Sequence, residues 1–243
     1  MNQLVAVFEV VVIALAGSFI TQFGFSLCKV PPEQVLTETS FLFIFMVSEA
    51  TISLLFVTLF LEARGESLAK IGWRKGNFRK EALLGLAIVP ILFCATSLVG
   101  VFFHLALPQY VSTTNPLLEL LRNKVDLLFF LTSSLYVGGF KEEVQRAFVL
   151  VRFERYLGGT TLGLILWSIF FAFGHHLQGI DKAAGAGVLG LLFGILYIWR
   201  RTLIAPMLSH AAFDITTLLF FWFFMRGTLE EGINAARLVG LLI

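Results

Sequence analysis

The sequence is poor in charged residues. Asp, Glu, Lys and Arg make up 14% of its 243 residues, whereas soluble domains carry about a quarter. Hydrophobic residues make up 58%, and the mean hydropathy is +0.87. This composition argues against a soluble globular protein and favours a chain that lies largely in a lipid bilayer.

Several marks of soluble enzymes and of nucleic-acid-binding proteins are also missing. The net charge is only +2, so bulk charge predicts no nucleic-acid partner. The two cysteines, Cys28 and Cys94, lie in apolar segments, which argues against a disulfide framework or a thiol metal site. The sequence contains no H-E-x-x-H motif, no G-x-S-x-G elbow and no P-loop.

Runs of about twenty apolar residues follow one another along the chain, the length that crosses a bilayer core ~30 Å thick. The alternating ten-residue strands of a membrane barrel are absent from the sequence. We predict an all-α, polytopic integral membrane protein with about seven to eight transmembrane helices and an intramembrane cavity. No linker divides it, so residues 1–243 are predicted to form one transmembrane domain. The spans are expected at residues 4–28, 40–61, 82–105, 126–156, 160–179, 183–199 and 203–225.

Basic residues predict the orientation of these spans. With the N-terminus in the cytoplasm, the connections before the third, fifth and seventh spans hold most of the Lys and Arg residues. Lys141 and Arg146 are counted here with the inner end of the fourth span. The apolar tail 233–243 is too short to cross again and is expected at the membrane interface.

Polar residues interrupt three of the late spans at similar depth. Glu142, Glu143 and Arg146 lie in the fourth span, and Glu142 is about 20 Å from its cytoplasmic end on a straight helix. His175 lies about 21 Å and His210 about 14 Å from the same face. Charged groups at such depth are costly and usually face a cavity, where they carry function.

The spacing of these residues suggests pairs. Glu142 and Arg146 are four apart, so we expect them to share a helix face and to form an ion pair. His210 and Asp214 are also four apart, as an oriented histidine would need. Taken alone, each pair could equally fix helix packing, and a single buried histidine such as His175 is more often a packing residue. Together, at one depth, they indicate hydrolytic or metal-binding chemistry.

Two further acids lie within the first two predicted spans. Glu9 is near the cytoplasmic end of the first span, and we expect its side chain to reach the interface. Glu49 lies midway along the second span without a partner in the sequence, and it is a weaker candidate for the lining of the same cavity.

With these residues, the sequence resembles the CPBP family, which comprises CAAX proteases, bacteriocin-processing enzymes and Abi proteins. The resemblance rests on three ordered motifs: EEVQR beginning at Glu142, FAFGH ending at His175, and HAAFD running from His210 to Asp214. Two features depart from the family pattern. Glu143 and Arg146 are separated by two residues instead of three, which leaves open which glutamate acts as the base, and Asp214 stands where many relatives carry Asn.

The resemblance implies an intramembrane endopeptidase with its catalytic core at about residues 126–225. Its substrate would be a membrane-associated protein or peptide, and the eukaryotic relatives suggest one with a prenylated CAAX-type C-terminus. In the mechanism that we favour, Glu142 and His175 activate a water, and His210, oriented by Asp214, stabilises the oxyanion. Glu143 would position the water or hold the hydrogen bonds of the site.

Two alternatives stay open at this stage. In the first, Glu142, His175 and His210 bind zinc, although the favoured mechanism requires no cofactor. In the second, the protein is a non-catalytic membrane scaffold or bacteriocin-immunity protein of the same fold. The protein is expected in the plasma membrane if the host is prokaryotic, with its active site opening toward the cytoplasmic side.

Overall fold

Every secondary-structure element in the described part of the chain is a helix. The structure, a computed structural model, describes residues 2–74, 77–112 and 115–225. The long helices are α1 (Gln3–Leu27), α3 (Thr39–Glu62), α4 (Phe78–Ala106), α7 (Glu143–Tyr156), α8 (Thr160–Gly174), α9 (Ile180–Arg200) and α10 (Ile204–Phe220). The shorter ones are α2 (Pro32–Thr37), η1 (Leu68–Ile71), η2 (Pro108–Tyr110), α5 (Pro116–Glu119), α6 (Lys124–Ser133), η3 (Ser134–Glu142), η4 (His176–Gln178) and η5 (Phe221–Met225).

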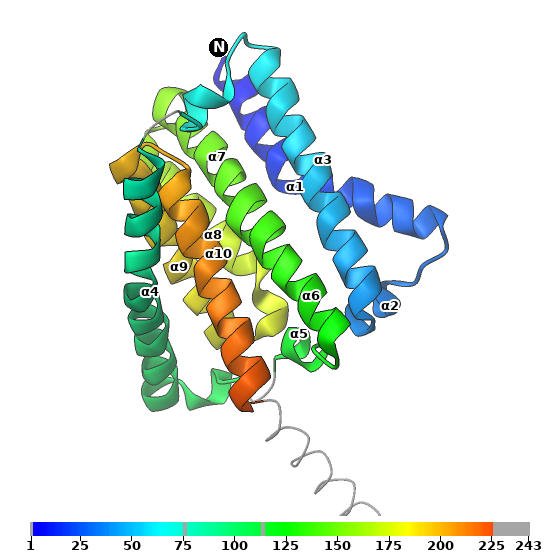
Figure 1. The fold of residues 1–243 in the computed structure, drawn as a ribbon. Helices are drawn as coiled ribbons and strands as arrows, with labels where there is room; N and C mark the ends of the chain where they lie inside the picture. The colour runs from blue at the N-terminus through cyan, green and yellow to red at the C-terminus, as the bar shows by residue number, and fades with distance from the viewer. Residues whose placement is uncertain (1, 75–76, 113–114, 226–243) are drawn as a thin grey trace, which may run out of the picture.

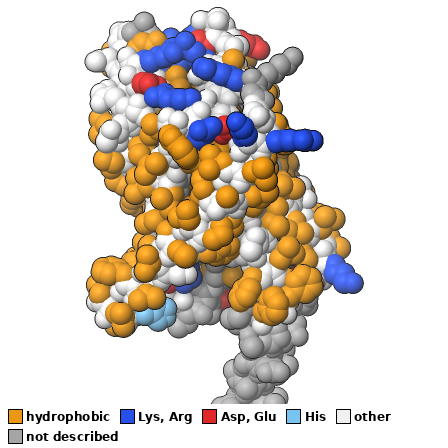
Figure 2. Space-filling model, turned by 60° about the vertical axis from the view of Figure 1, so that its left-hand side comes forward, with side chains coloured by type: hydrophobic (Ala, Val, Ile, Leu, Met, Phe, Trp, Pro, Cys, Tyr) orange, Lys and Arg blue, Asp and Glu red, His pale blue; other side chains and the backbone are white. Residues whose placement is uncertain are grey.

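Five of these helices are long and apolar enough to cross a bilayer: α1, α3, α4, α9, and α10 extended to Phe224. A helix satisfies its own backbone hydrogen bonds, as the hydrocarbon core requires. Figure 2 shows a broad apolar surface over the middle of the molecule, with Lys and Arg gathered at one end. The all-helical, multi-pass membrane fold is therefore confirmed, but the predicted count of seven to eight spans is not.

The two other predicted spans differ from simple transmembrane helices. The span expected at 160–179 ends as α8 at Gly174, and its 15 residues extend about 22 Å, less than the ~30 Å of a bilayer core. The fourth span is a composite of α6, η3 and α7, in which η3 is a π-helix. The predicted tail at 233–243 lies outside the described residues.

Helix α7 lies at the centre of the molecule. It contacts α1 and α3 on one side and α8 on the other, while η3, which precedes it, packs against α10 (Figure 1). Its residues from Glu143 to Arg152 are all buried, and several of them form the largest apolar core cluster. A helix buried on every side can carry charged side chains only if they find partners inside the protein.

Partners inside the protein bear on two of the predictions. Glu9 does not reach the interface: it is 2% exposed, and its carboxylate contacts Arg152 at 2.7 Å and Arg64 at 2.5 Å. Lys141, which the sequence analysis counted with the inner end of the fourth span, is 8% exposed and lies within the protein. Each of these two residues is paired with an opposite charge that a neighbouring helix supplies.

Candidate active site

The π-helix η3 positions the acidic motif. Glu142 is its last residue and Glu143 is the first residue of α7, so the two carboxylates stand at the junction of two helical geometries. π-helical segments are rare, and they frequently occur at functional sites. The junction directs the two neighbouring glutamates into different surroundings, which distinguishes their possible roles.

Glycines let α10 approach this junction closely. A Cβ atom on Gly138 would lie only 2.6 Å from Oδ2 of Asp214 and 3.5 Å from Nε2 of His210. A Cβ atom on Gly139 would lie 2.8 Å from the Cβ of Ala211. Sequence reasoning missed both glycines, although their position four and three residues before Glu142 was a usable signal.

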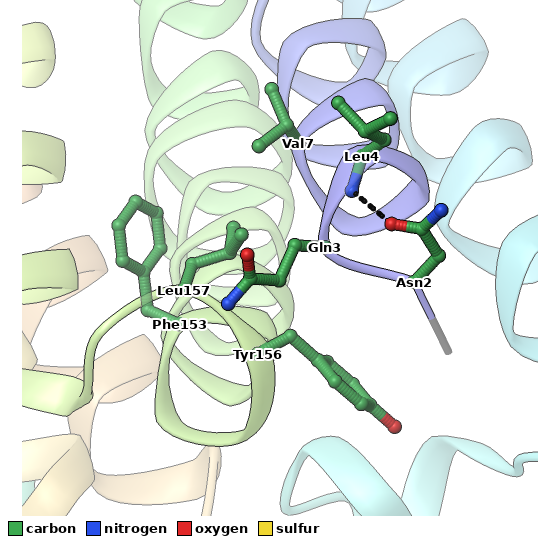
Figure 3. A pocket seen from close by; sticks show the side chains of 7 residues that line it. All are labelled: Asn2, Gln3, Leu4, Val7, Phe153, Tyr156 and Leu157. Carbon is green, nitrogen blue, oxygen red and sulfur yellow. Dashed lines mark hydrogen bonds between the residues drawn. The ribbon is translucent and has the colours of Figure 1, made fainter.

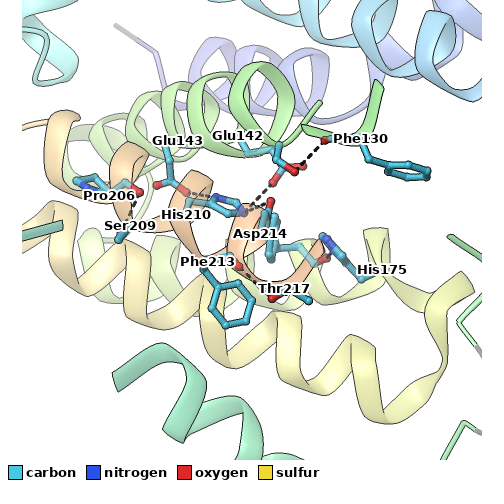
Figure 4. Close-up of polar contacts among 12 residues, drawn as sticks. Phe130, Glu142, Glu143, His175, Pro206, Ser209, His210, Phe213, Asp214 and Thr217 are labelled. Atoms are coloured by element: carbon cyan, nitrogen blue, oxygen red, sulfur yellow. Dashed lines mark hydrogen bonds and ion pairs between the residues drawn. The ribbon is translucent and has the colours of Figure 1, made fainter. Parts of the chain in front are cut away.

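Glu143 is the fully buried carboxylate of the pair. Its side chain is 1% exposed, and Oε1 forms an ion pair with Nη1 of Arg146. The same oxygen is 2.8 Å from Nδ1 of His210. Because a carboxylate paired with an arginine acts as an acceptor, we assign the hydrogen of His210 to Nδ1. Glu143 therefore holds both a cation and the histidine in place, as Figure 4 shows for the contact with His210.

Glu142 has a different environment. The expected ion pair with Arg146 is not formed, since Arg146 pairs with Glu143. Oε2 of Glu142 is instead 3.7 Å from Nε2 of His210, and the side chain is 21% exposed. Oδ2 of Asp214 lies 3.8 Å from the same nitrogen, with its side chain 33% exposed. Two partly exposed carboxylates thus flank one histidine nitrogen without a direct hydrogen bond to it (Figure 4).

Aromatic rings enclose the buried half of this cluster. The His210 ring stacks on Phe193 at 4.4 Å between centroids and meets the ring of Phe171 edge-on at 6.0 Å. The Arg146 guanidinium lies 5.0 Å from the ring centroid of Phe171 and 5.4 Å from that of Phe193. Such faces attract cations, and they keep water from the Glu143–Arg146 pair.

His175 stands at the end of α8, next to the cluster. It is half-buried, and its Nδ1 is 2.9 Å from the carbonyl oxygen of Phe171. Because a carbonyl only accepts, Nδ1 carries the hydrogen, and Nε2 of the neutral ring keeps a lone pair. No hydrogen bond joins His175 to Glu142 in the described residues.

A buried ion pair next to the motif was not predicted. Nζ of Lys141 lies 2.8 Å from Oε2 of Glu49, with both side chains about one-tenth exposed. Ser53 donates to the other oxygen of Glu49 at 3.1 Å. Glu49 was only a weak candidate for the site, and its contact is with the residue before Glu142. No signal in the sequence predicted the pairing of Glu49 with Lys141, because their helices meet only in the folded protein.

The predicted zinc ligands do not form a metal site here. Within the described ranges, no group of three His, Cys, Asp or Glu side chains is placed to hold a metal ion. The set Glu142, His175 and His210 is therefore not assembled as a ligand shell, and none of the steps proposed below involves a metal.

An open pocket of about 480 Å³ lies away from this cluster (Figure 3). It is formed by the start of α1 and the end of α7, with Gln3, Phe153 and Tyr156 among its lining residues. It contains none of the predicted site residues. Its lining offers no carboxylate and no histidine, so we do not assign chemistry to it.

One comparison with known families matches the part of the chain that contains the cluster. Residues 123–216 match the family model described as type II CAAX prenyl endopeptidase Rce1-like. This segment is similar to CAAX proteases. The match confirms the resemblance predicted from the three motifs, and it covers less than half of the chain but includes all six predicted site residues. No curated protein and no solved structure matches the chain. Because the family is one of proteases, the match supports a CAAX-type intramembrane protease.

Proposed function

We propose that the protein is an intramembrane endopeptidase in which Glu142 is the general base. The observation that carries this proposal is the contrast between the two glutamates. Glu143 is buried and committed to Arg146 and His210, whereas Glu142 is partly exposed and makes no hydrogen bond to another described residue. A base must be free to take a proton and must be reachable by water and substrate.

In the proposed reaction, a water lies between Glu142 and Nε2 of His210. Polar groups 3.7 Å apart, as these are, suit a bridging water better than a direct bond. Glu142 takes a proton from this water as its oxygen attacks the carbonyl carbon of the scissile peptide bond. The carbonyl π bond breaks, and its electron pair leaves a negative charge on the oxygen of the tetrahedral intermediate.

Histidine side chains stabilise that intermediate in this scheme. When both nitrogens of His210 are protonated, Nδ1 donates to Glu143 and Nε2 can donate to the oxyanion. In this proposal Glu143 orients His210, because it lies 2.8 Å from Nδ1, and Asp214, to which the sequence analysis gave that role, does not. The lone pair on Nε2 of His175 can accept a second hydrogen bond from the attacking water. The C–N bond breaks as Glu142 returns its proton to the leaving nitrogen, which yields a carboxylic acid and an amine. The new acid then loses its proton to the amine or to water.

The proposal also covers the substrate and the orientation of the protein in the membrane. The family match is to prenyl endopeptidases, so we propose a membrane-associated substrate with a prenylated CAAX-type C-terminus. We also propose that the basic end of the molecule faces the cytoplasm and that the site opens toward it, in the plasma membrane of a prokaryotic host. The gathering of Lys and Arg at one end supports this orientation (Figure 2).

The proposal is tested by comparing newly formed protein termini in host membranes that carry the wild type, Glu142→Gln or Glu62→Gln. Glu62 is an exposed acid at the end of α3, so its replacement controls for the loss of one charge. We expect termini that vanish with Glu142→Gln and persist with Glu62→Gln. Identical termini in all three membranes would refute the proteolytic role of Glu142. They would instead favour the alternative of a non-catalytic membrane scaffold, which the family match does not favour.

A further inference from the structure

A second pocket, of about 370 Å³, lies at the end of the molecule where basic side chains gather. Three segments that are far apart in the sequence form its walls: η1 with the residues after it, the end of α7, and the end of α9. It is separate from the proposed active site and shares no residue with it. Its volume falls within the ~300–1,000 Å³ of small-molecule sites.

The charges around this pocket are strongly unbalanced. Four cations line it, and a single carboxylate, that of Glu154, accompanies them. Glu154 is already engaged by Arg201, whose two terminal nitrogens lie 2.7 Å and 2.9 Å from its oxygens. These hydrogen bonds raise the pKa of the Arg201 guanidinium, which therefore stays charged. The remaining three cations are Lys70, Arg74 and Arg155.

Two of these cations have no acidic partner among the described residues. Nε of Arg74 donates only to the carbonyl of Ala69, at 3.1 Å, and Lys70 forms no ion pair there. Arg155 contacts Glu66 at 3.3 Å. Like charges held around one hollow repel each other, and an anion between them would relieve that repulsion.

The backbone of the pocket is fixed in a way that suits a preformed site. The buried hydroxyl of Tyr197 donates to the carbonyl of Ile71 at 3.1 Å. Gly72, with φ of 98°, approaches the chain after α9 so closely that a Cβ there would lie 3.2 Å from the Cα of Thr202. Arg201 itself has φ of 53°, an uncommon conformation for a residue other than glycine. Unusual backbone conformations of this kind often occur at ligand sites.

The pocket also borders the ends of candidate membrane spans. Arg201 directly follows the span of α9, and η1 lies in the connection between the spans of α3 and α4. Trp73, next to Arg74, is 49% exposed, and tryptophan is enriched where membrane and water meet. Basic pockets in this position favour phosphate groups.

We propose that this pocket binds a phosphate-bearing anion through Lys70, Arg74, Arg155 and Arg201. The same chemistry could be presented by the headgroup of an anionic phospholipid or by free phosphate. Arginine supplies planar, two-pronged contacts to phosphate oxygens, and lysine adds a mobile point charge.

The test compares the purified full chain with two double variants of equal charge change. Lys70→Gln/Arg74→Gln removes the two cations that lack acidic partners, and Arg79→Gln/Lys80→Gln removes two exposed cations of the same end that do not line the pocket. Thermal midpoints are measured in neutral detergent while sodium phosphate replaces sodium chloride at constant ionic strength. In a second arm, the protein is placed in phosphatidylcholine nanodiscs with or without phosphatidylglycerol, and retained lipid is counted by native mass spectrometry.

We expect the wild type and Arg79→Gln/Lys80→Gln to respond, either with a midpoint raised by phosphate or with phosphatidylglycerol retained in the second arm. For Lys70→Gln/Arg74→Gln, the apparent dissociation constant should rise at least about tenfold, as two charge-assisted contacts are lost. A response to phosphatidylglycerol alone would identify a lipid headgroup as the source, and a response to phosphate alone would identify the free ion. Equal responses of both double variants, or no response of the wild type, would overturn the proposal. All of these readouts are independent of proteolysis.

Discussion

Replacing Lys141 by methionine should destabilise the protein and slow its reaction, and the additional replacement of Glu49 by leucine should largely restore both. Nζ of Lys141 and Oε2 of Glu49 are 2.8 Å apart, with the two side chains 9% and 11% exposed. Ser53 adds a hydrogen bond to the same carboxylate. The pair joins η3 to α3 at the residue before Glu142.

The size of the effect follows from burial. Removing one partner of a buried ion pair leaves an uncompensated charge, which costs ~3–5 kcal/mol, whereas an apolar pair of similar volume is often neutral or better. At ~2–4 °C per kcal/mol for a chain of this size, each single variant should lower the thermal midpoint by on the order of 10 °C. The double variant should unfold close to the wild-type temperature.

The catalytic effect follows from the position of Lys141. A shift of about 1 Å in a reacting group can cost ~10²-fold in rate, and the backbone of Lys141 continues directly into Glu142. We therefore expect Lys141→Met to lower kcat with little change in KM. The assay measures midpoints in detergent, together with kcat and KM on the substrate found by terminus analysis, for the wild type, both single variants and the double variant. Single-variant costs below about 1 kcal/mol, as exposed pairs give, or losses that simply add in the double variant, would refute the reasoning.

Three further predictions concern the site itself. Gly138→Ala should lower kcat by ~10²-fold, because its Cβ would displace the Asp214 carboxylate, whereas Gly100→Ala, with open space around it, should leave kcat unchanged; equal rates would contradict this. Asp214→Asn should keep activity within about tenfold, since an amide can donate to the oxyanion, and a loss as large as that of Glu142→Gln would instead make Asp214 the base. A saturating zinc chelator should leave the cleavage rate of the purified enzyme unchanged, and a loss that added zinc reverses would establish the metal mechanism.

Much of the fold could be predicted because hydropathy alone marks where a chain enters and leaves a membrane. The predicted span at 4–28 corresponds to α1, Gln3–Leu27, and the one at 82–105 to α4, Phe78–Ala106. The predicted span at 160–179 runs past the end of α8. The residues after Gly174, HHLQG, are mostly polar, and the chain turns there, with Gly179 at φ of 112° before α9 begins. The fall in hydrophobicity and the turn at this glycine together mark the boundary.

The site could be predicted as a group of residues but not as a set of contacts. Depth along the helices was enough to place Glu142, His175 and His210 near one another. Spacing could not choose the partner of Arg146, since positions three and four residues apart both share its helix face. The choice depends on His210, whose Nδ1 lies against Glu143 and fixes that carboxylate beside the arginine. That contact joins α7 to α10 and leaves no trace in the local sequence.

The distribution of buried charges assigns the remaining roles. Glu49, Glu143 and Glu9 are each less than one-tenth exposed, and each is paired with a cation, Lys141, Arg146 and Arg152 respectively. The attraction within each pair offsets the cost of removing its charges from water. Holding two helices together is therefore a sufficient role for these pairs. Glu142 and Asp214 differ, because both face a histidine nitrogen and neither contacts a Lys or Arg within the described residues. The lack of a compensating Lys or Arg is what favours Glu142 as the proposed base, and it makes Asp214 the alternative that the Asp214→Asn variant tests.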